Sequence, residues 1–177
     1  LATMMLSDFG ATVIKVEKPG GDPFRCLAAA PMWLRGKQSI ELNLKSPAGV
    51  ARLHGLVADS DLLVSNQQQH QAAKLACDYA TLAALNPRLI YCQITGFGDR
   101  GPYAALPAYE GVVAAKAGRM KGMEYISARD EPAYSAVPVM THATAQNTLS
   151  ALLAALLERR RSGLGQLVKT SLLQGLM

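Results

Sequence analysis

The sequence predicts an α/β fold, because short stretches rich in β-branched residues alternate with helical segments along most of the chain. The expected strands are residues 12–17, 39–44, 61–64, 89–95 and 167–171. The expected helices are residues 1–8, a segment starting at 47, 79–85 and 143–161. This alternation favours right-handed βαβ units and therefore a Rossmann-like, mainly parallel sheet flanked by helices.

Local signals mark where these helices begin and end. Gly10 and Gly163 suit the left-handed position just past a helix, and Ser46 before Pro47 suits a helix start. Asn86–Pro87 should end the helix before the fourth strand. The apolar stripe of residues 149–157 makes the last helix the clearest one.

Length and composition predict one ordered domain spanning residues 1–177. A chain of 177 residues can bury one substantial core and is short for two domains. Half of the residues are hydrophobic and 18% are charged, which excludes a disordered chain.

The formal net charge of +5 suits an anionic partner. The basic residues are scattered, and the run 159–161 lies where the end of a helix attracts cations. This distribution favours a small anionic ligand, and no nucleic-acid partner is expected.

The cysteines predict neither a metal site nor a disulfide framework. Cys26, Cys77 and Cys92 are widely separated and odd in number, so we expect no metal and a reducing, cytoplasmic setting. The longest apolar stretch is about half of the roughly 20 residues that a membrane span needs, so no membrane partner is expected. Because Leu1 reads as mid-helix, we expect the chain to be part of a longer protein.

Four stretches, in order, resemble class III CoA-transferases of the CaiB/BaiF type, which include formyl-CoA transferases and α-methylacyl-CoA racemases. They are SDFGATVIKVEKPGGDPFR (7–25), LRGKQSIELNLKSPAGVARL (34–53), NPRLIYCQITGFGDRGPYAALPAYEGV (86–112) and ALLERRRSGLGQLVKTSLLQ (155–174). The resemblance implies the large domain of that family, without its small domain, in an interlinked homodimer. It implies CoA or acyl-CoA as substrate, a small carboxylic acid as second partner, and no permanently bound cofactor.

The resemblance also implies the positions that contact CoA, which are Val16, Lys18, Asn66, Lys74, Gly96 and Gly98. The first two match the adenine and phosphate end, the next two match a nucleotide loop that is otherwise changed, and the glycines follow a strand where amides approach an anion or thioester. Each has an ordinary alternative: a strand residue, a solvated lysine, a solvated polar loop or a simple turn.

The family's catalytic aspartate is replaced in this chain. In the family that aspartate attacks the acyl-CoA thioester to form an enzyme-bound anhydride, and Thr141 stands at its position. No acid lies between Glu131 and Glu158, so a small shift of alignment does not restore it. Thr141 is interpreted first as the N-cap of the last helix. Two other hypotheses are a Thr141 nucleophile with His142 as base, and a carboxylate supplied by Glu110 from a neighbouring loop.

The predicted function is therefore a CoA-transferase that binds CoA thioesters and moves CoA between carboxylic acids. One alternative is a catalytically silent CoA-binding homologue, or the inactive half of a larger assembly, because of Thr141. A second alternative is an acyl-CoA racemase.

Overall fold

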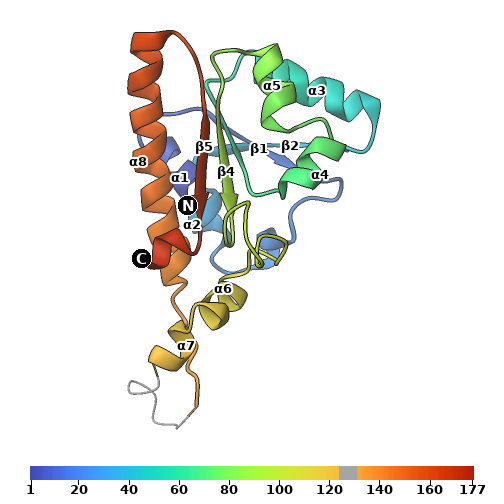
Figure 1. Ribbon diagram of the computed structural model, residues 1–177. Coiled ribbons are helices and arrows are strands. Elements are labelled where there is room, and N and C mark those ends of the chain that lie inside the picture. The colour runs from blue at the N-terminus through green and yellow to red at the C-terminus, as the bar shows by residue number, and fades with distance from the viewer. Residues whose placement is uncertain (124–130) are drawn as a thin grey trace.

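The computed structural model describes residues 1–123 and 131–177, and these form a mixed α/β structure with parallel sheets (Figure 1). The strands are β1 (Val13–Glu17), β2 (Lys37–Glu41), β3 (Leu62–Ser65), β4 (Ile90–Thr95) and β5 (Leu167–Ser171). The longer helices are α1 (Ala2–Asp8), α3 (Pro47–Ala58), α5 (Tyr79–Leu85), α6 (Glu110–Lys116) and α8 (Val139–Ser162). The short ones are η1 (Pro23–Cys26), α2 (Ala30–Leu34), α4 (Gln69–Lys74), α7 (Arg119–Gly122) and η3 (Gln174–Leu176).

The strands form two sheets in the described part of the chain. β1 pairs with β2, and β4 lies between β3 and β5, with every pair parallel. The predicted fold class is confirmed. Parallel neighbours require a crossover, and α3, α5 and α8 lie in the connections between strands.

Most predicted elements lie within a residue or two of their observed bounds, and β2 is an exception. We expected residues 39–44 in strand, whereas β2 ends at Glu41. Asn43 turns the chain there: its side chain accepts a hydrogen bond from the Lys45 amide, and its carbonyl accepts one from the Ser46 amide. Leu42 and Leu44 still pack against the core. The alternation of apolar and polar residues over 39–44 therefore predicted their burial correctly, but it did not predict where the strand ends.

The predicted helix ends follow from local chemistry. Ser46 Oγ accepts from the Gly49 amide at 3.2 Å and caps α3, with Pro47 in the first turn. Gly163 follows α8 with a φ of 77°, which is the left-handed conformation expected there. The start of α8 differs from the prediction, because the helix begins at Val139 and not at residue 143.

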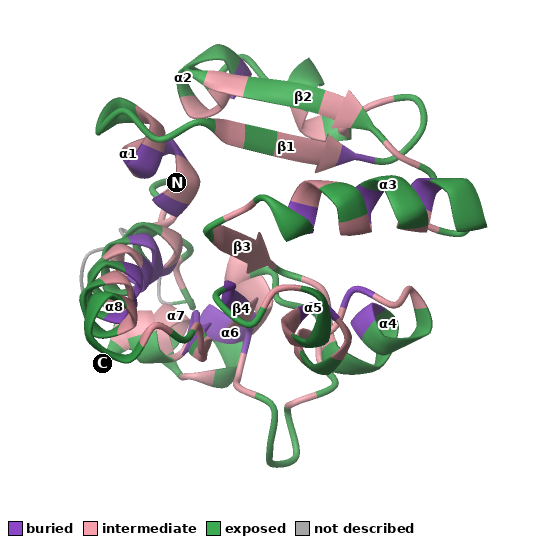
Figure 2. Ribbon diagram, turned by 90° about the horizontal axis from the view of Figure 1, so that it is seen from above, coloured by how far each residue is buried: buried purple, intermediate pink, exposed green. Residues whose placement is uncertain are grey.

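The core lies on both faces of β4. Leu82, Leu89 and Tyr91 belong to a cluster with residues of α3, and Ile90 and Cys92 belong to a second cluster with α1 and α8. This division follows from the alternation of side chains along a strand. Seen from above, α1 and α8 lie on one side of β3 and β4, and α3, α4 and α5 lie on the other (Figure 2).

Candidate functional site

The candidate site centres on Glu110 and the first turn of α8. Glu110 Oε1 accepts a hydrogen bond from the Met140 amide at 3.1 Å. Its Oε2 accepts from the Thr141 amide at 2.9 Å and from Thr141 Oγ1 at 2.5 Å. One carboxylate from the start of α6 therefore satisfies two of the amides that a helix leaves unpaired at its N-terminus.

Apolar packing brings the two helix starts together. Val113 of α6 and Met140 of α8 are both fully buried and share a cluster with Leu172, which follows β5. α6 and α8 meet near the carboxyl ends of β4 and β5, at the lower end of the molecule in Figure 1. The N-terminus of a 24-residue helix also carries a partial positive charge that interacts favourably with a carboxylate.

The prediction that Thr141 is the N-cap of α8 is wrong. Thr141 is the third residue of the helix, Pro138 occupies the cap position, and no cap side chain bonds the amides. The Thr141 hydroxyl donates to Glu110 and accepts no helix amide. The reason is tertiary, because a carboxylate from a distant segment supplies the acceptor that the local sequence was expected to supply.

His142 contacts residues other than Thr141. Its Nδ1 lies 2.9 Å from the Pro138 carbonyl, and its exposed ring meets Trp33 edge to face at a centroid distance of 5.4 Å. Thr141 Oγ1 instead lies on Glu110. Of the three predicted catalytic residues, the structure thus joins Glu110 to Thr141 and directs His142 elsewhere.

The two predicted glycines have structural reasons of their own. A Cβ on Gly96 would lie 3.1 Å from the Ala108 Cα, so any larger residue would require the chain before α6 to shift by a few tenths of an ångström. Gly98 has a φ of +91°, and its amide donates to Thr95 Oγ1 at 2.9 Å. The glycines thus position the loop that leads from β4 to Glu110.

The other predicted CoA contacts follow strands β1 and β3. Val16 lies in β1 opposite Ile40 and is partly buried against the core. Lys18 is exposed directly after β1, Asn66 is exposed after β3, and Lys74 is exposed in the last turn of α4. In the described part of the chain, no hydrogen bond or ion pair joins Lys18 to Asn66 or Lys74. All three side chains are exposed to solvent.

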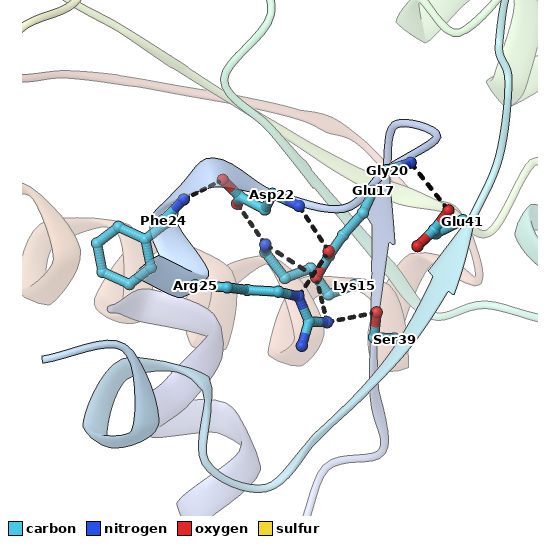
Figure 3. A network of polar contacts seen from close by, with 8 residues as sticks. All are labelled: Lys15, Glu17, Gly20, Asp22, Phe24, Arg25, Ser39 and Glu41. Atoms are coloured by element: carbon cyan, nitrogen blue, oxygen red, sulfur yellow. Dashed lines mark hydrogen bonds and ion pairs between the residues drawn. The ribbon is translucent and has the colours of Figure 1, made fainter. Parts of the chain in front are cut away.

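Sequence reasoning missed a charged network at the end of β1, drawn in Figure 3. Glu17, of which only 4% is exposed, bonds Arg25 and Lys15. The Arg25 guanidinium, with help from Lys15 and the Asp22 amide, lowers the pKa of Glu17 to about 2 although burial acts in the opposite direction. The available signal was an acidic residue at the buried end of a strand with basic residues close in sequence.

A shallow hollow opens beside Glu110. Its lining includes Ala114, Arg119, Met120 and Tyr134. Its enclosed volume of about 10 Å³ is room for about one water molecule. The described residues alone therefore do not enclose a substrate here.

Metal-ligating side chains and long apolar helices were sought over residues 1–123 and 131–177. No group of three or more metal-ligating side chains occurs in those ranges, and none of their helices could cross a membrane. Cys26, Cys77 and Cys92 are free, and burial raises the pKa of the Cys92 thiol to about 11.

The sequence matches the profile described as CoA-transferase family III over residues 1–177. The chain belongs to this family. A succinate–glutarate CoA-transferase of Agrobacterium fabrum is 40% identical, over 97% of this chain and 46% of that protein. A formyl-CoA:oxalate CoA-transferase of Escherichia coli is 36% identical, over 96% of this chain and 43% of that protein.

Solved structures agree with this family membership. Rv3272 of Mycobacterium tuberculosis superposes with a TM-score of 0.91 at 32% identity, covering 99% of this chain and 49% of that one. A CaiB/BaiF family protein of Brucella suis superposes with a TM-score of 0.87 at 32% identity, over 98% of this chain and 49% of that one. The chain thus spans about half the length of the family III relatives it matches.

Proposed function

We propose that residues 1–177 form one large-domain unit of a class III CoA-transferase, which moves CoA between small carboxylic acids. The observation that carries the proposal is the position of the Glu110 carboxylate, 2.9 Å from the amide of Thr141. Thr141 stands at the position that the resemblance gives to the family aspartate, and in this proposal Glu110, from another helix, supplies the carboxylate in its place.

In the proposed reaction, a Glu110 oxygen attacks the thioester carbonyl carbon, the carbon–sulfur bond breaks, and CoA leaves as thiolate. The thiolate then attacks the Glu110 carbonyl carbon of the mixed anhydride, releasing the donor acid and leaving a glutamyl-CoA thioester. The acceptor carboxylate attacks that thioester, giving a new anhydride and thiolate. Attack of the thiolate on the acceptor acyl carbon yields the new acyl-CoA and restores the carboxylate.

The hydrogen bonds at the start of α8 have a defined role in this scheme. The amides of Met140 and Thr141 and the Thr141 hydroxyl hold the carboxylate in one orientation. Preorganised donors of this kind also stabilise oxygen atoms that gain negative charge as a carbonyl is attacked. We assign Thr141 to positioning Glu110, and we assign no chemical step to His142.

The proposed CoA-binding residues are Val16, Lys18, Asn66, Lys74, Gly96 and Gly98. The exposed lysines after β1 and on α4 supply positive charge for the phosphates of CoA. CoA enters as substrate, with no permanently bound cofactor, and the whole protein is proposed to be an interlinked homodimer. Because one relative is a succinate–glutarate CoA-transferase, short dicarboxylic acids are the first substrates to test.

One observation favours the catalytically silent alternative. The Glu110 carboxylate accepts hydrogen bonds from three donors at the start of a helix, and a purely structural cap would do the same. A protein of this kind would bind CoA thioesters without forming an anhydride. No observation in the described residues favours the racemase alternative.

The deciding experiment incubates the intact protein with succinyl-CoA and glutarate labelled with ¹⁸O in its carboxylates. Turnover through Glu110 transfers ¹⁸O into its side chain, which peptide mass spectrometry detects, and produces glutaryl-CoA. Glu110→Gln should lower turnover by roughly 1,000-fold or more, because an amide is a poor nucleophile. Thr141→Ala, the matched variant that keeps the carboxylate, should lose about 10-fold to 100-fold through poorer positioning.

Full turnover in Glu110→Gln would overturn the assignment of the nucleophile. CoA binding without turnover or label in the wild type, together with transfer activity gained by Thr141→Asp, would establish the silent alternative.

A further inference from the structure

The loop that carries Lys18 is held by its own backbone donors. The Gly20 amide donates to Glu41 Oε2 at 3.0 Å, and the Gly21 amide donates to the Lys18 carbonyl at 2.9 Å. The Asp22 amide donates to Glu17 Oε2 at 2.9 Å. Gly20 and Gly21 have φ values of 85° and 79°, so the loop depends on two residues in the left-handed region.

Glu17 is the centre of this arrangement (Figure 3). Its Oε2 also accepts from Arg25 Nε at 2.9 Å, and its Oε1 accepts from Arg25 Nη2 at 2.7 Å and from Lys15 Nζ at 3.1 Å. Lys15 pairs in turn with Asp22, whose Oδ1 accepts from the Phe24 amide and caps η1. A single buried carboxylate therefore joins the end of β1, the loop and η1.

The network extends to the neighbouring strand. Arg25 Nη2 donates to Ser39 Oγ at 2.8 Å, and Glu41, which takes the Gly20 amide, also lies in β2. The loop is thus held by side chains of both β1 and β2. Because Glu17 is buried, releasing Arg25, Lys15 or the Asp22 amide would leave its carboxylate short of a partner, which favours the bonded arrangement of the loop.

This bonding limits how the loop can contact an anion. The amides of Gly20, Gly21 and Asp22 are all used within the protein, so they cannot form a phosphate-binding nest. Lys15 and Arg25 are neutralised by Glu17 and Asp22. Lys18 is exposed, and within the described residues its ammonium group has no acidic partner. It is the remaining cationic contact that this loop offers.

We propose that Glu17 is a positioning residue for CoA: by fixing the loop of residues 18–22 it holds the Lys18 ammonium group ready for the phosphates of the CoA nucleotide. The proposal rests on the proposed function, in that the anion is CoA. It adds that the loop contacts CoA through Lys18. It also adds that Glu17 increases the affinity for CoA by positioning Lys18, although the charge of a carboxylate would repel the phosphates.

A double-mutant cycle on the intact protein tests this, with the Kd of CoA measured by calorimetry. Lys18→Met should weaken binding about tenfold, the size of one charge-assisted contact. Glu17→Gln should weaken it by a similar factor, because its new N–H group faces the Asp22 and Arg25 donors and releases the loop. In the double variant the loss should stay near tenfold, because a released loop without Lys18 has no contact left to lose.

Two further variants keep the test decisive. Glu41→Ala removes the acceptor of the Gly20 amide and should weaken CoA binding about threefold, again only when Lys18 is present. This variant replaces Glu17→Gln if Glu17→Gln does not fold. Asp61→Asn removes an exposed ion pair with Arg159 at the amino end of β3 and should leave the Kd unchanged.

The outcomes separate the two proposals. A loss near 100-fold in the double variant shows that Glu17 acts independently of Lys18, and this overturns the inference while the proposed function stands. A coupled cycle in a protein without transferase turnover supports the inference and removes the transfer step. A wild-type protein that does not bind CoA overturns both.

Discussion

The two sheets in the described part of the chain are stabilised by different interactions. In β4, the first four residues are buried, and they pack between helices on both faces. In β1 and β2, Glu17 is the one fully buried residue, and it is charged. The larger sheet is thus stabilised by apolar burial and the smaller one by a network of ion pairs, so they should respond to different perturbations.

The largest effect is expected in the apolar sheet. Leu152 of α8 is fully buried against Ile90 and Cys92, so Leu152→Ala should lower the free energy of unfolding by about 3 kcal/mol. Urea denaturation measures this change. Leu153, its neighbour, is 48% exposed, and Leu153→Ala is the matched control with an expected loss under about 1 kcal/mol. Equal losses would contradict the packing of α8 described here.

The charged sheet should give the next largest effect. Glu17→Ala leaves Lys15, Arg25 and the Asp22 amide without their acceptor, and we expect a loss of about 2 kcal/mol, less than for a wholly buried pair because Arg25 is half exposed. Thermal and urea unfolding both report it. Glu41 is exposed, so Glu41→Ala should lower the free energy of unfolding by well under half as much. If Glu17→Ala left the free energy of unfolding unchanged, the network would contribute nothing to stability.

Acid should weaken the charged sheet selectively. The pKa of Glu17 is lowered to about 2 from an ordinary value of 4.5, so its contribution is complete above pH 4.5 and is lost as the pH falls towards 2. The difference in stability between wild type and Glu17→Gln should therefore shrink across this range. The difference between wild type and Leu152→Ala should not, since burial of leucine involves no proton; urea midpoints at several pH values compare the two.

The smallest expected effect concerns the accessibility of the three cysteine thiols and does not involve a change in stability. Cys26 in η1 is exposed, whereas Cys77 and Cys92 are buried and burial raises the pKa of both thiols. A thiol reagent at pH 8 should label Cys26 quickly and the other two only after unfolding. Mass spectrometry counts the labels, and rapid modification of Cys92 in the native protein would contradict the burial of β4.

Several elements could be predicted because their causes are local. The bounds of β5 and α5, the cap at Ser46 and the left-handed Gly163 all depend on a few consecutive residues. The short helices α2, α4 and α7 were not predicted, since segments of four to six residues are too short to show a helical period.

The candidate site, too, has features that could be predicted from the sequence and others that could not. Glu110 and Thr141 could each be named from motif position, but their contact spans 31 residues of sequence and arises from the packing of α6 on α8. The network around Glu17 was missed because a glutamate at a strand end is ordinarily a solvated residue, and its burial becomes visible only when Arg25 folds over it.

By itself, the sequence determined the family, the alternation of strands and helices, and the absence of an acidic residue between Glu131 and Glu158, because periodicity, turn residues and motif order are all properties of consecutive residues. Only the tertiary structure decided that a carboxylate nevertheless lies at the start of α8 and that the Lys18 loop is held by Glu17. Both depend on side chains meeting across long separations, where packing between elements determines the distance.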